Sequence, residues 1–207
     1  MIRIVHCGIG NLQSVLNALD SLGHAATVAE TPADLKGATR LILPGVGSFR
    51  QSAEKLKADG WKAALDEMVL GAKVPVLGIC LGMQLIAQWG DEHGGAEGLG
   101  WIEGRVQMIP RTTPDLRLPH VGWNDIDILR DLPLFKGLGA ERSCYFVHSF
   151  QFVTDRPEDR VAVTDYGGPV TAAVARDNIF GVQFHPEKSH HVGLTILDNF
   201  VRMQPPC

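Results

Sequence analysis

The sequence lacks the features that would indicate a membrane, a nucleic acid or a structural metal as its partner. No apolar run is long enough to cross a bilayer, and the formal net charge of −4 favours neither nucleic acid nor an anionic membrane surface. The four cysteines lie far apart and form no Cys-x-x-Cys pair, which argues against zinc ribbons and redox motifs. The N-terminus has no basic region followed by an apolar signal core. We therefore expect a cytoplasmic protein whose thiols are reduced.

Internal repeats, low-complexity segments and a linker are also missing, so the 207 residues are expected to form a single domain, residues 1–207. Gly8-Ile-Gly10 is only a fragment of the dinucleotide fingerprint, because Gln13 occupies the third glycine position. His190 and His191 have no accompanying carboxylate or cysteine pattern, so a solvated helix start is expected there. We expect neither a cofactor nor a metal site.

Short apolar strands alternate with helical segments in the first half of the chain. This alternation predicts an α/β fold, with a mostly parallel central sheet and helices on both of its faces. After Gly90 the segments are short and separated by turn residues, which predicts an added mixed or antiparallel sheet in the C-terminal half. The expected strands are 2–5, 25–28, 40–43, 74–79, 105–109, 125–129, 143–148, 161–165, 170–176 and 179–183, and the expected helices are 12–22, 61–70, 83–88 and 192–201. Two further helix starts are expected at 31–34 and after Ser48, which can cap a helix.

One cysteine stands where a strand must turn directly into a helix. Cys80 follows the apolar run Val74–Ile79 and has glycine two positions before and two positions after it. This is the spacing of a nucleophile elbow, with cysteine in place of serine, and a helix N-terminus favours thiolate. The alternative is a buried structural cysteine, which would not need the two glycines.

A cysteine nucleophile needs a base, and the base needs a group that orients it. His185 follows the apolar strand Val182–Phe184, and Glu187 lies two residues further on. A carboxylate at that spacing can bind the imidazole nitrogen that faces away from Cys80. Without the elbow, a strand-capping histidine and a solvated acid would be the better interpretation.

Pro44-Gly-Val-Gly47 is the candidate oxyanion loop, because it follows another strand at the same edge of the sheet. Acyl transfer builds negative charge on the attacked oxygen, and backbone N–H groups stabilise that charge. The N–H of Leu81 is one expected donor, and the N–H of Val46 or Gly47 is the second. A turn that simply ends a strand would have the same composition.

Together these motifs resemble the class I, or triad, glutamine amidotransferases, through Gly78-Ile-Cys-Leu-Gly-Met-Gln84 and Phe184-His-Pro-Glu187. More narrowly, the chain resembles the glutaminase subunits of imidazole glycerol phosphate synthases, from Ile2 to the last helix. The segments that carry this resemblance are Gly8-Ile-Gly-Asn-Leu12, Pro44-Gly-Val-Gly-Ser-Phe49, Pro119-His-Val-Gly-Trp-Asn124, Tyr145-Phe-Val-His-Ser-Phe150 and His185-Pro-Glu-Lys-Ser189. His6-Cys7 and Gln13 depart from the usual family residues, which are Asp-Tyr and Arg.

The resemblance implies a heterodimer with a TIM-barrel cyclase subunit. This chain would hydrolyse glutamine to glutamate and ammonia, and the ammonia would be channelled to the cyclase. The cyclase would make imidazole glycerol phosphate and aminoimidazole carboxamide ribotide in histidine biosynthesis.

Roles for individual residues follow from the same resemblance. Cys80 would attack the glutamine amide, His185 would move the proton, and Glu187 would orient His185. The residues expected to bind glutamine are Gln84, His148, Ser149 and Phe150, and those expected to meet the cyclase are Asn11, Trp123 and Lys188.

Two other functions are compatible with this fold class. One is the glutaminase of another class I amidotransferase, such as the one of pyridoxal phosphate synthesis, against which Val46 and the segment 119–124 count. The other is a catalytically silent interaction module, against which an intact Cys80, His185 and Glu187 count.

Overall fold

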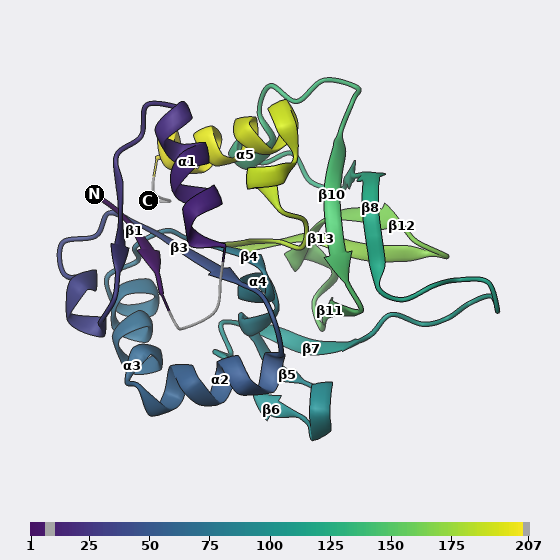
Figure 1. Cartoon of the computed structure of the whole chain (residues 1–207), viewed down its shortest axis with the longest axis horizontal. Helices are drawn as coiled ribbons and strands as arrows, with labels where there is room; N and C mark the ends of the chain where they lie inside the picture. The colour runs from purple at the N-terminus through teal and green to yellow at the C-terminus, as the bar shows by residue number, and fades with distance from the viewer. Residues whose placement is uncertain (7–10, 205–207) are drawn as a thin grey trace.

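The computed structural model describes residues 1–6 and 11–204, and its largest element is an eight-stranded sheet with helices on both faces (Figure 1). The sheet order is β2-β1-β3-β4-β14-β13-β12-β9. The first five strands in this order are parallel: β2 (Ala26–Ala29), β1 (Ile2–Val5), β3 (Arg40–Gly45), β4 (Val76–Cys80) and β14 (Ile179–Val182). The last three are antiparallel to their neighbours: β13 (Pro169–Arg176), β12 (Arg160–Asp165) and β9 (Asp127–Ile128). The predicted α/β fold class is therefore confirmed.

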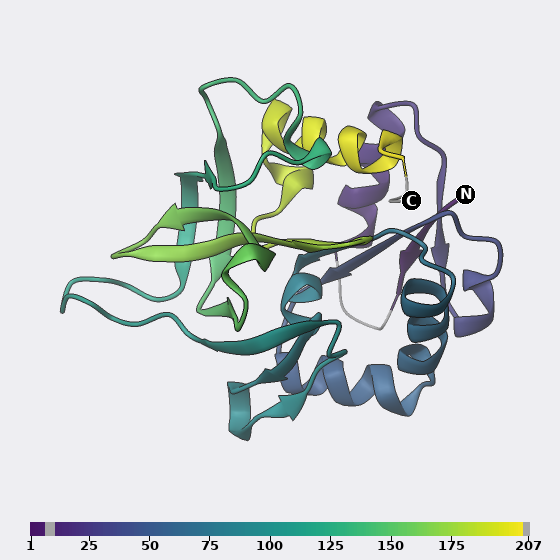
Figure 2. The ribbon, with the colours of Figure 1, turned by 180° about the vertical axis from the view of Figure 1, so that it is seen from behind.

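Two apolar cores lie on opposite faces of this sheet, and each is covered by its own helices (Figures 1 and 2). Helices α1 (Leu12–Ser21) and α5 (His190–Arg202) cover one face. The other face is covered by α2 (Phe49–Ala58), α3 (Trp61–Asp66) with the π-helical turn Glu67–Gly71, and the short α4 (Leu81–Leu85). Successive residues of β3 enter alternate cores, with Ile42 in one and Leu41 and Leu43 in the other. Burial on both faces explains why these strands are continuously apolar.

Two smaller sheets are added to the central one. A four-stranded sheet has the order β11-β7-β5-β6, and β8 pairs with β10 in an antiparallel ribbon. Their bounds are β5 (Ala87–Gly90), β6 (Ala96–Glu97), β7 (Ile102–Met108), β8 (His120–Asp125), β10 (Ser143–His148) and β11 (Phe150–Thr154). Single 3₁₀ turns occupy Pro32–Leu35, Glu92–Gly94, Pro133–Phe135, Pro157–Asp159 and Pro186–Lys188. Among the residues described, no helix has the length and apolar composition needed to cross a bilayer.

The helix expected at 83–88 is wrong in its length and position. Helix α4 ends at Leu85, and β5 begins two residues later. The backbone N–H groups of Leu99 and Trp101 donate to the carbonyls of Leu85 and Ile86 at 2.7 and 2.9 Å. These tertiary hydrogen bonds satisfy the carbonyls that a longer helix would have used, so they override the local helix propensity.

The strand expected at 125–129 is also wrong, because two strands of different sheets meet there. Strand β8 ends at Asp125 and β9 begins at Asp127, with the buried Ile126 between them. Strands β5, β6 and β11 were not expected at all.

Candidate functional site

The turn at Cys80 is a tight strand-to-helix elbow. Cys80 is the last residue of β4, and α4 begins at the next residue. Its φ of 54° lies in the left-handed region that non-glycine residues avoid, and its ψ is −110°. A Cβ on Gly82 would lie 1.7 Å from the Leu43 carbonyl oxygen, and one on Gly78 would lie 2.6 Å from the Gly82 oxygen. The elbow therefore needs both glycines, as their spacing in the sequence indicates.

His185 and Glu187 lie next to this elbow, because β14 pairs directly with β4. Val182 is the register partner of Ile79, so His185 lies beyond the same end of the sheet as Cys80. The Nδ1 of His185 binds the Oε1 of Glu187 at 2.8 Å, and only 3% and 1% of the two side chains is exposed. The carboxylate fixes the proton on Nδ1, which leaves Nε2 for the pocket. No described residue makes a hydrogen bond to Nε2.

Opposing effects set the charge of His185. Burial lowers the pKa of His185, but Cys80 and Glu187 outweigh it and raise the pKa to about 9. The imidazole is therefore positively charged at neutral pH and lies beside the sulfur. A positive neighbour of this kind favours a thiolate nucleophile. Because α4 has only five residues, the contribution of a helix dipole to this effect is smaller than the sequence suggested.

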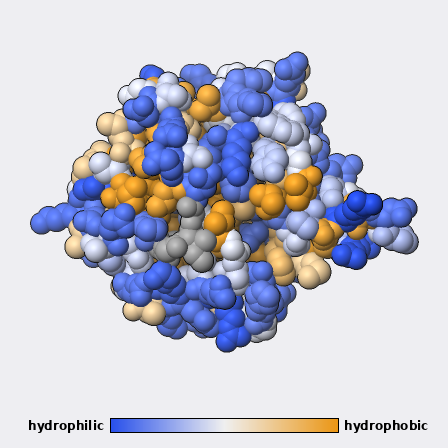
Figure 3. All heavy atoms as spheres, viewed as in Figure 1, coloured by the Kyte–Doolittle hydropathy of each residue, from blue (hydrophilic) through white to orange (hydrophobic). Residues whose placement is uncertain are grey.

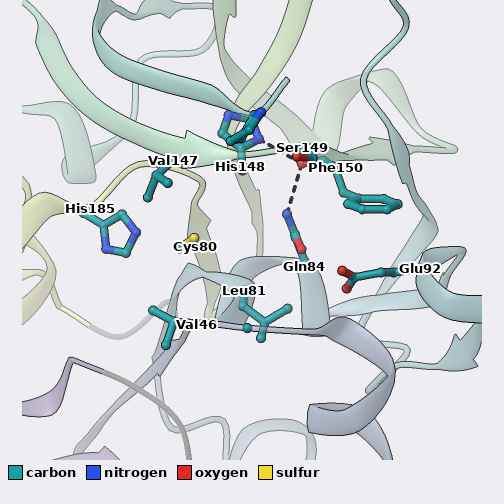
Figure 4. A pocket seen from close by; sticks show the side chains of 12 residues that line it. Val46, Cys80, Leu81, Gln84, Glu92, Val147, His148, Ser149, Phe150 and His185 are labelled. Atoms are coloured by element: carbon teal, nitrogen blue, oxygen red, sulfur yellow. Dashed lines mark hydrogen bonds between the residues drawn. The ribbon is translucent and has the colours of Figure 1, made fainter. Parts of the chain in front are cut away.

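Cys80 and His185 open into a cavity of about 310 Å³ (Figure 4). Its walls contain most of the residues that the sequence proposes for the reaction. The residues that line it are Val46, Gly47, Cys80, Leu81, Gln84, Glu92, Pro119, Val147, His148, Ser149, Phe150 and His185. Three of them, Glu92, Pro119 and Val147, were not proposed from the sequence.

Gln84 has its amide nitrogen fully used by the protein. Its Nε2 donates to the carbonyl oxygen of Phe150 at 3.0 Å and to the Oε1 of Gln183 at 2.9 Å. Only the Oε1 of Gln84 is then left for a ligand, and it can only accept a hydrogen bond. Figure 4 shows this oxygen between Cys80 and the carboxylate of Glu92. The cavity wall thus contains two acceptor groups, the Oε1 of Gln84 and the carboxylate of Glu92.

Glu92 was missed because it lies in the segment 91–100, for which the sequence predicts neither a helix nor a strand. The Oε2 of Glu92 accepts the backbone N–H of Phe49 at 2.6 Å, at the start of α2. This long-range bond holds the carboxylate at the cavity wall. No local sequence pattern predicts this hydrogen bond.

His148 belongs to a pair of buried neutral histidines behind the cavity wall. Its Nδ1 donates to the Phe150 carbonyl at 2.8 Å, and its Nε2 accepts from the Nδ1 of His120 at 3.1 Å. Burial lowers the pKa of each histidine to about 4. The Nε2 of His120 then accepts from Asn124 at 3.4 Å, and the His120 ring is stacked between Phe146 and Tyr166. The histidine pair thus holds the Phe150 carbonyl in place, and this carbonyl also accepts from the side-chain amide of Gln84.

The candidate oxyanion loop lies directly beside the nucleophile. Gly45 is the register partner of Cys80 on the neighbouring strand, so Val46 and Gly47 follow at the cavity wall. Gly47 has a φ of 98°, whereas the φ of Val46 is not positive. The loop therefore has its left-handed residue at glycine, where it costs little.

The β8–β10 ribbon presents an apolar face next to the cavity mouth. Trp123 is 48% exposed and pairs in register with Tyr145. The Lys188 Nζ lies 5.7 Å from the centre of the Tyr145 ring, and the His190 ring is stacked on Trp123 at 4.6 Å. His190 is exposed and is the first residue of α5, as the solvated helix start predicts, and its ring also packs on Trp123. We call this cluster of Trp123, Tyr145, Lys188 and His190 the aromatic patch.

Further exposed apolar side chains extend this surface. Val121 and Val147 pair in register on the same ribbon, and 55% and 38% of these residues is exposed. Figure 3 shows apolar residues gathered across the middle of the face that is viewed in Figure 1. Asn11 lies elsewhere, before α1, where it lines a small hollow that also reaches His185 and Glu187.

The remaining candidates are placed away from the cavity. His6 binds Glu30 at 2.6 Å, and Gln13 donates to Asn17 at 2.8 Å, while Cys7 lies outside the described residues. Burial raises the pKa of Cys144 to about 12, so this thiol stays neutral. Within residues 1–6 and 11–204, no three His, Cys, Asp or Glu side chains are grouped to hold a metal ion.

Comparison with known sequences gives one family over nearly the whole chain. The profile of the family described as glutamine amidotransferase class-I matches residues 3–203. A protein from Campylobacter jejuni named imidazole glycerol phosphate synthase subunit HisH 1 is 45% identical over 98% of this chain and 100% of its own length. The subunit HisH of Bdellovibrio bacteriovorus is 46% identical, with 97% of this chain and 98% of that protein covered.

Comparison with solved structures finds the same fold in more distant proteins. A crystal structure of a glutamine amidotransferase superposes with a TM-score of 0.74 at 19% identity, covering 97% of this chain and 98% of the other. The structure of PurLQS from Thermotoga maritima gives a TM-score of 0.70 at 18% identity, covering 97% of this chain and 96% of the other. At such identities the likeness concerns the fold alone.

Proposed function

This chain belongs to the class-I glutamine amidotransferase family, and we propose that it is the subunit that releases ammonia from glutamine within imidazole glycerol phosphate synthase, in histidine biosynthesis. The observation that carries the proposal is the convergence of Cys80 and the His185–Glu187 pair on one cavity with acceptors for an amino acid. In this proposal residues 1–207 act as one amidotransferase domain, and the reaction needs no cofactor.

The acceptors of the cavity define how glutamine binds. The Glu92 carboxylate pairs with the α-ammonium group, and the Oε1 of Gln84 accepts a second hydrogen bond from it. The 148–150 segment surrounds the amino-acid end of the substrate. The side-chain amide of glutamine then extends towards Cys80.

The first half of the reaction forms a thioester. The Cys80 thiolate attacks the amide carbon, and the carbonyl electrons move onto oxygen. The backbone N–H of Leu81 and that of Val46 or Gly47 stabilise this oxyanion. When the oxyanion collapses, the C–N bond breaks, and Nε2–H of His185 protonates the leaving nitrogen to give ammonia.

The second half returns the enzyme to its starting state. Neutral His185 takes a proton from water as the water attacks the thioester carbon. Collapse of this second oxyanion breaks the C–S bond and releases glutamate and the Cys80 thiolate. Glu187 holds the imidazole in one orientation throughout and stabilises its charged form.

The partner in this proposal is a TIM-barrel cyclase subunit, which receives the ammonia in a heterodimer. Asn11 and the aromatic patch are the surface proposed to meet it, with Trp123 as the apolar anchor. Backbone and side-chain bonds tie the patch to the triad. The backbone N–H of His185 donates to the Tyr145 carbonyl at 2.9 Å, and the Tyr145 N–H donates to Ser189 Oγ at 3.0 Å.

Ammonia release from glutamine, measured with and without the cyclase, tests the proposal. We expect release that depends on Cys80 and increases when the cyclase and its ligand are present. A catalytically silent module would release none under either condition. A glutaminase of another synthase would not respond to this cyclase.

A further inference from the structure

Gln183 is a buried polar residue beside the nucleophile to which the reaction described above gives no role. It is 0% exposed and lies just beyond β14, two residues before His185. Its backbone N–H donates to the Ala172 carbonyl at 2.8 Å, which holds it against β13. Its side-chain Nε2 lies 3.7 Å from Cys80 Sγ, within hydrogen-bonding distance for sulfur.

The hydrogen-bond direction between Gln183 and Cys80 can be worked out from the Phe150 carbonyl, because a carbonyl acts only as an acceptor. The Phe150 carbonyl can only accept, so the end of Gln84 that faces it must be the NH₂ group. That NH₂ group also faces Gln183, so the end of Gln183 nearest to it must be the carbonyl oxygen. The opposite end of the Gln183 amide, which faces Cys80 Sγ, is then an N–H donor.

We propose that Gln183 is a further catalytic residue, which donates an N–H to the Cys80 sulfur and stabilises the thiolate. The inference rests on the proposed function only in taking Cys80 as the nucleophile. His185 loses its Nε2 proton when ammonia leaves, whereas the amide N–H of Gln183 is never transferred. It therefore faces the sulfur at every stage, including the moment when the C–S bond of the thioester breaks and the thiolate forms again.

Alkylation of Cys80 by iodoacetamide tests this role without glutamine. The thiolate displaces iodide, and mass analysis of the Cys80 peptide gives the rate between pH 5 and 10. In Gln183→Met, which keeps the side-chain length but has no N–H, the midpoint of the pH profile should rise by about 0.5–1 unit. Below the wild-type midpoint the rate should fall about 3- to 10-fold. The plateau at high pH should be unchanged.

Gln151→Met is the matched control, because Gln151 is also a buried glutamine but lines a different hollow with Tyr166 and Pro169. Its pH midpoint should equal that of the wild type. Thermal unfolding of both variants reports whether they fold. If Gln183→Met does not fold, Gln84→Met replaces it, because it removes the group that orients the Gln183 amide and should shift the midpoint less, in the same direction.

An unchanged midpoint in folded Gln183→Met would overturn the inference. A lower plateau without a shift would overturn it as well, because it would indicate altered access to the sulfur. Neither result would affect the proposed glutaminase function, which the ammonia assay measures separately. Loss of ammonia release together with a shifted midpoint in Gln183→Met supports both the role of Gln183 and the proposed glutaminase function.

Discussion

At the scale of single residues, Gln84 and His185 each keep one hydrogen-bonding atom that the protein does not occupy. Gln84 has both N–H groups occupied and offers its oxygen. His185 has Nδ1 occupied by Glu187 and offers Nε2. These partners leave each side chain a single orientation, so the site is organised before a substrate enters.

The buried histidine pair gives a prediction for stability against pH. Histidine in an unfolded chain takes up a proton near pH 6.5, whereas the folded-state pKa of His120 and His148 is lowered to about 4 by burial. Between these pH values the unfolded chain binds more protons, so stability is present above pH 6.5 and is lost as the pH falls towards 4. As the pH is lowered from 6.5 towards 4, each such histidine reduces the free energy of unfolding by about 1.4 kcal/mol per pH unit.

Urea unfolding at pH 7 and pH 5 measures this loss. His120→Phe keeps an aromatic ring between Phe146 and Tyr166 but has no group to protonate. The variant should lose less stability than the wild type between the two pH values, because one of the two titrations is gone. An equal loss in both proteins would show that His120 does not contribute to the acid sensitivity.

At the scale of elements, the loop after β3 and the elbow after β4 lie side by side and form the two halves of the proposed oxyanion site. A flip of the Gly45–Val46 peptide, which would turn its N–H, rotates the ψ of Gly45 and the φ of Val46 together. Val46 has no positive φ in this structure, and a positive φ at a β-branched residue costs about 1–3 kcal/mol. We infer that docking of the cyclase supplies this free energy, which makes hydrolysis conditional on the partner.

Val46→Gly in the isolated subunit tests this inference. Glycine accepts positive φ without strain, so basal glutaminase activity should rise by about 5- to 100-fold. Steady-state ammonia release without the cyclase measures the change, with Val121→Gly as a control at an exposed valine outside the loop. Basal activity that stays at the wild-type level in Val46→Gly would rule out the strained flip as the barrier.

The sequence predicts those elements whose signals are local. The glycines around Cys80 locate the elbow, because a tight turn requires small residues at fixed positions. The apolar runs of β3 and β4 locate the parallel sheet, because strands that are buried on both faces are continuously apolar. The same reasoning placed the helix after Cys80 too far along, since the backbone bonds from Leu99 and Trp101 that end α4 come from a distant segment.

Two residues beside the nucleophile or in the cavity wall, Glu92 and Gln183, were not proposed from the sequence, for different reasons. Glu92 reaches the cavity only because its carboxylate holds the backbone N–H of Phe49, which lies 43 residues away. Gln183 did leave a signal, because it is a polar residue inside the apolar run Val182–Phe184, directly before His185. A buried polar side chain needs partners, and that requirement could have directed attention to it.

At the scale of the whole molecule, the aromatic patch and the cavity share one element, the β8–β10 ribbon. Val147 and His148 of β10 line the cavity, and Tyr145 of the same strand pairs in register with Trp123 in the patch. A partner that binds the aromatic patch therefore contacts a strand that lines the cavity proposed to bind glutamine.

Substitutions in the aromatic patch should weaken binding of the cyclase more than they affect folding. Trp123→Ala removes an exposed anchor, and its Kd should rise roughly 30-fold, or about 2 kcal/mol. Lys188→Ala removes an exposed charge and should raise the Kd less, by roughly 3-fold. Titration against the cyclase measures both, with Leu70→Ala as an exposed apolar control on the side of α3. Wild-type affinity and wild-type coupling of glutamine use to product in Trp123→Ala would refute this assignment.

The central claim is that Cys80 releases ammonia from glutamine for a cyclase that performs a separate reaction. Its most direct test is synthesis of imidazole glycerol phosphate by the complex of Cys80→Ala with the cyclase, supplied with either glutamine or ammonium salt. We predict that the glutamine-dependent rate falls by more than about 10³-fold, while the ammonia-dependent rate stays at the wild-type level. A Cys80→Ala complex that still used glutamine at a near-normal rate would contradict the account.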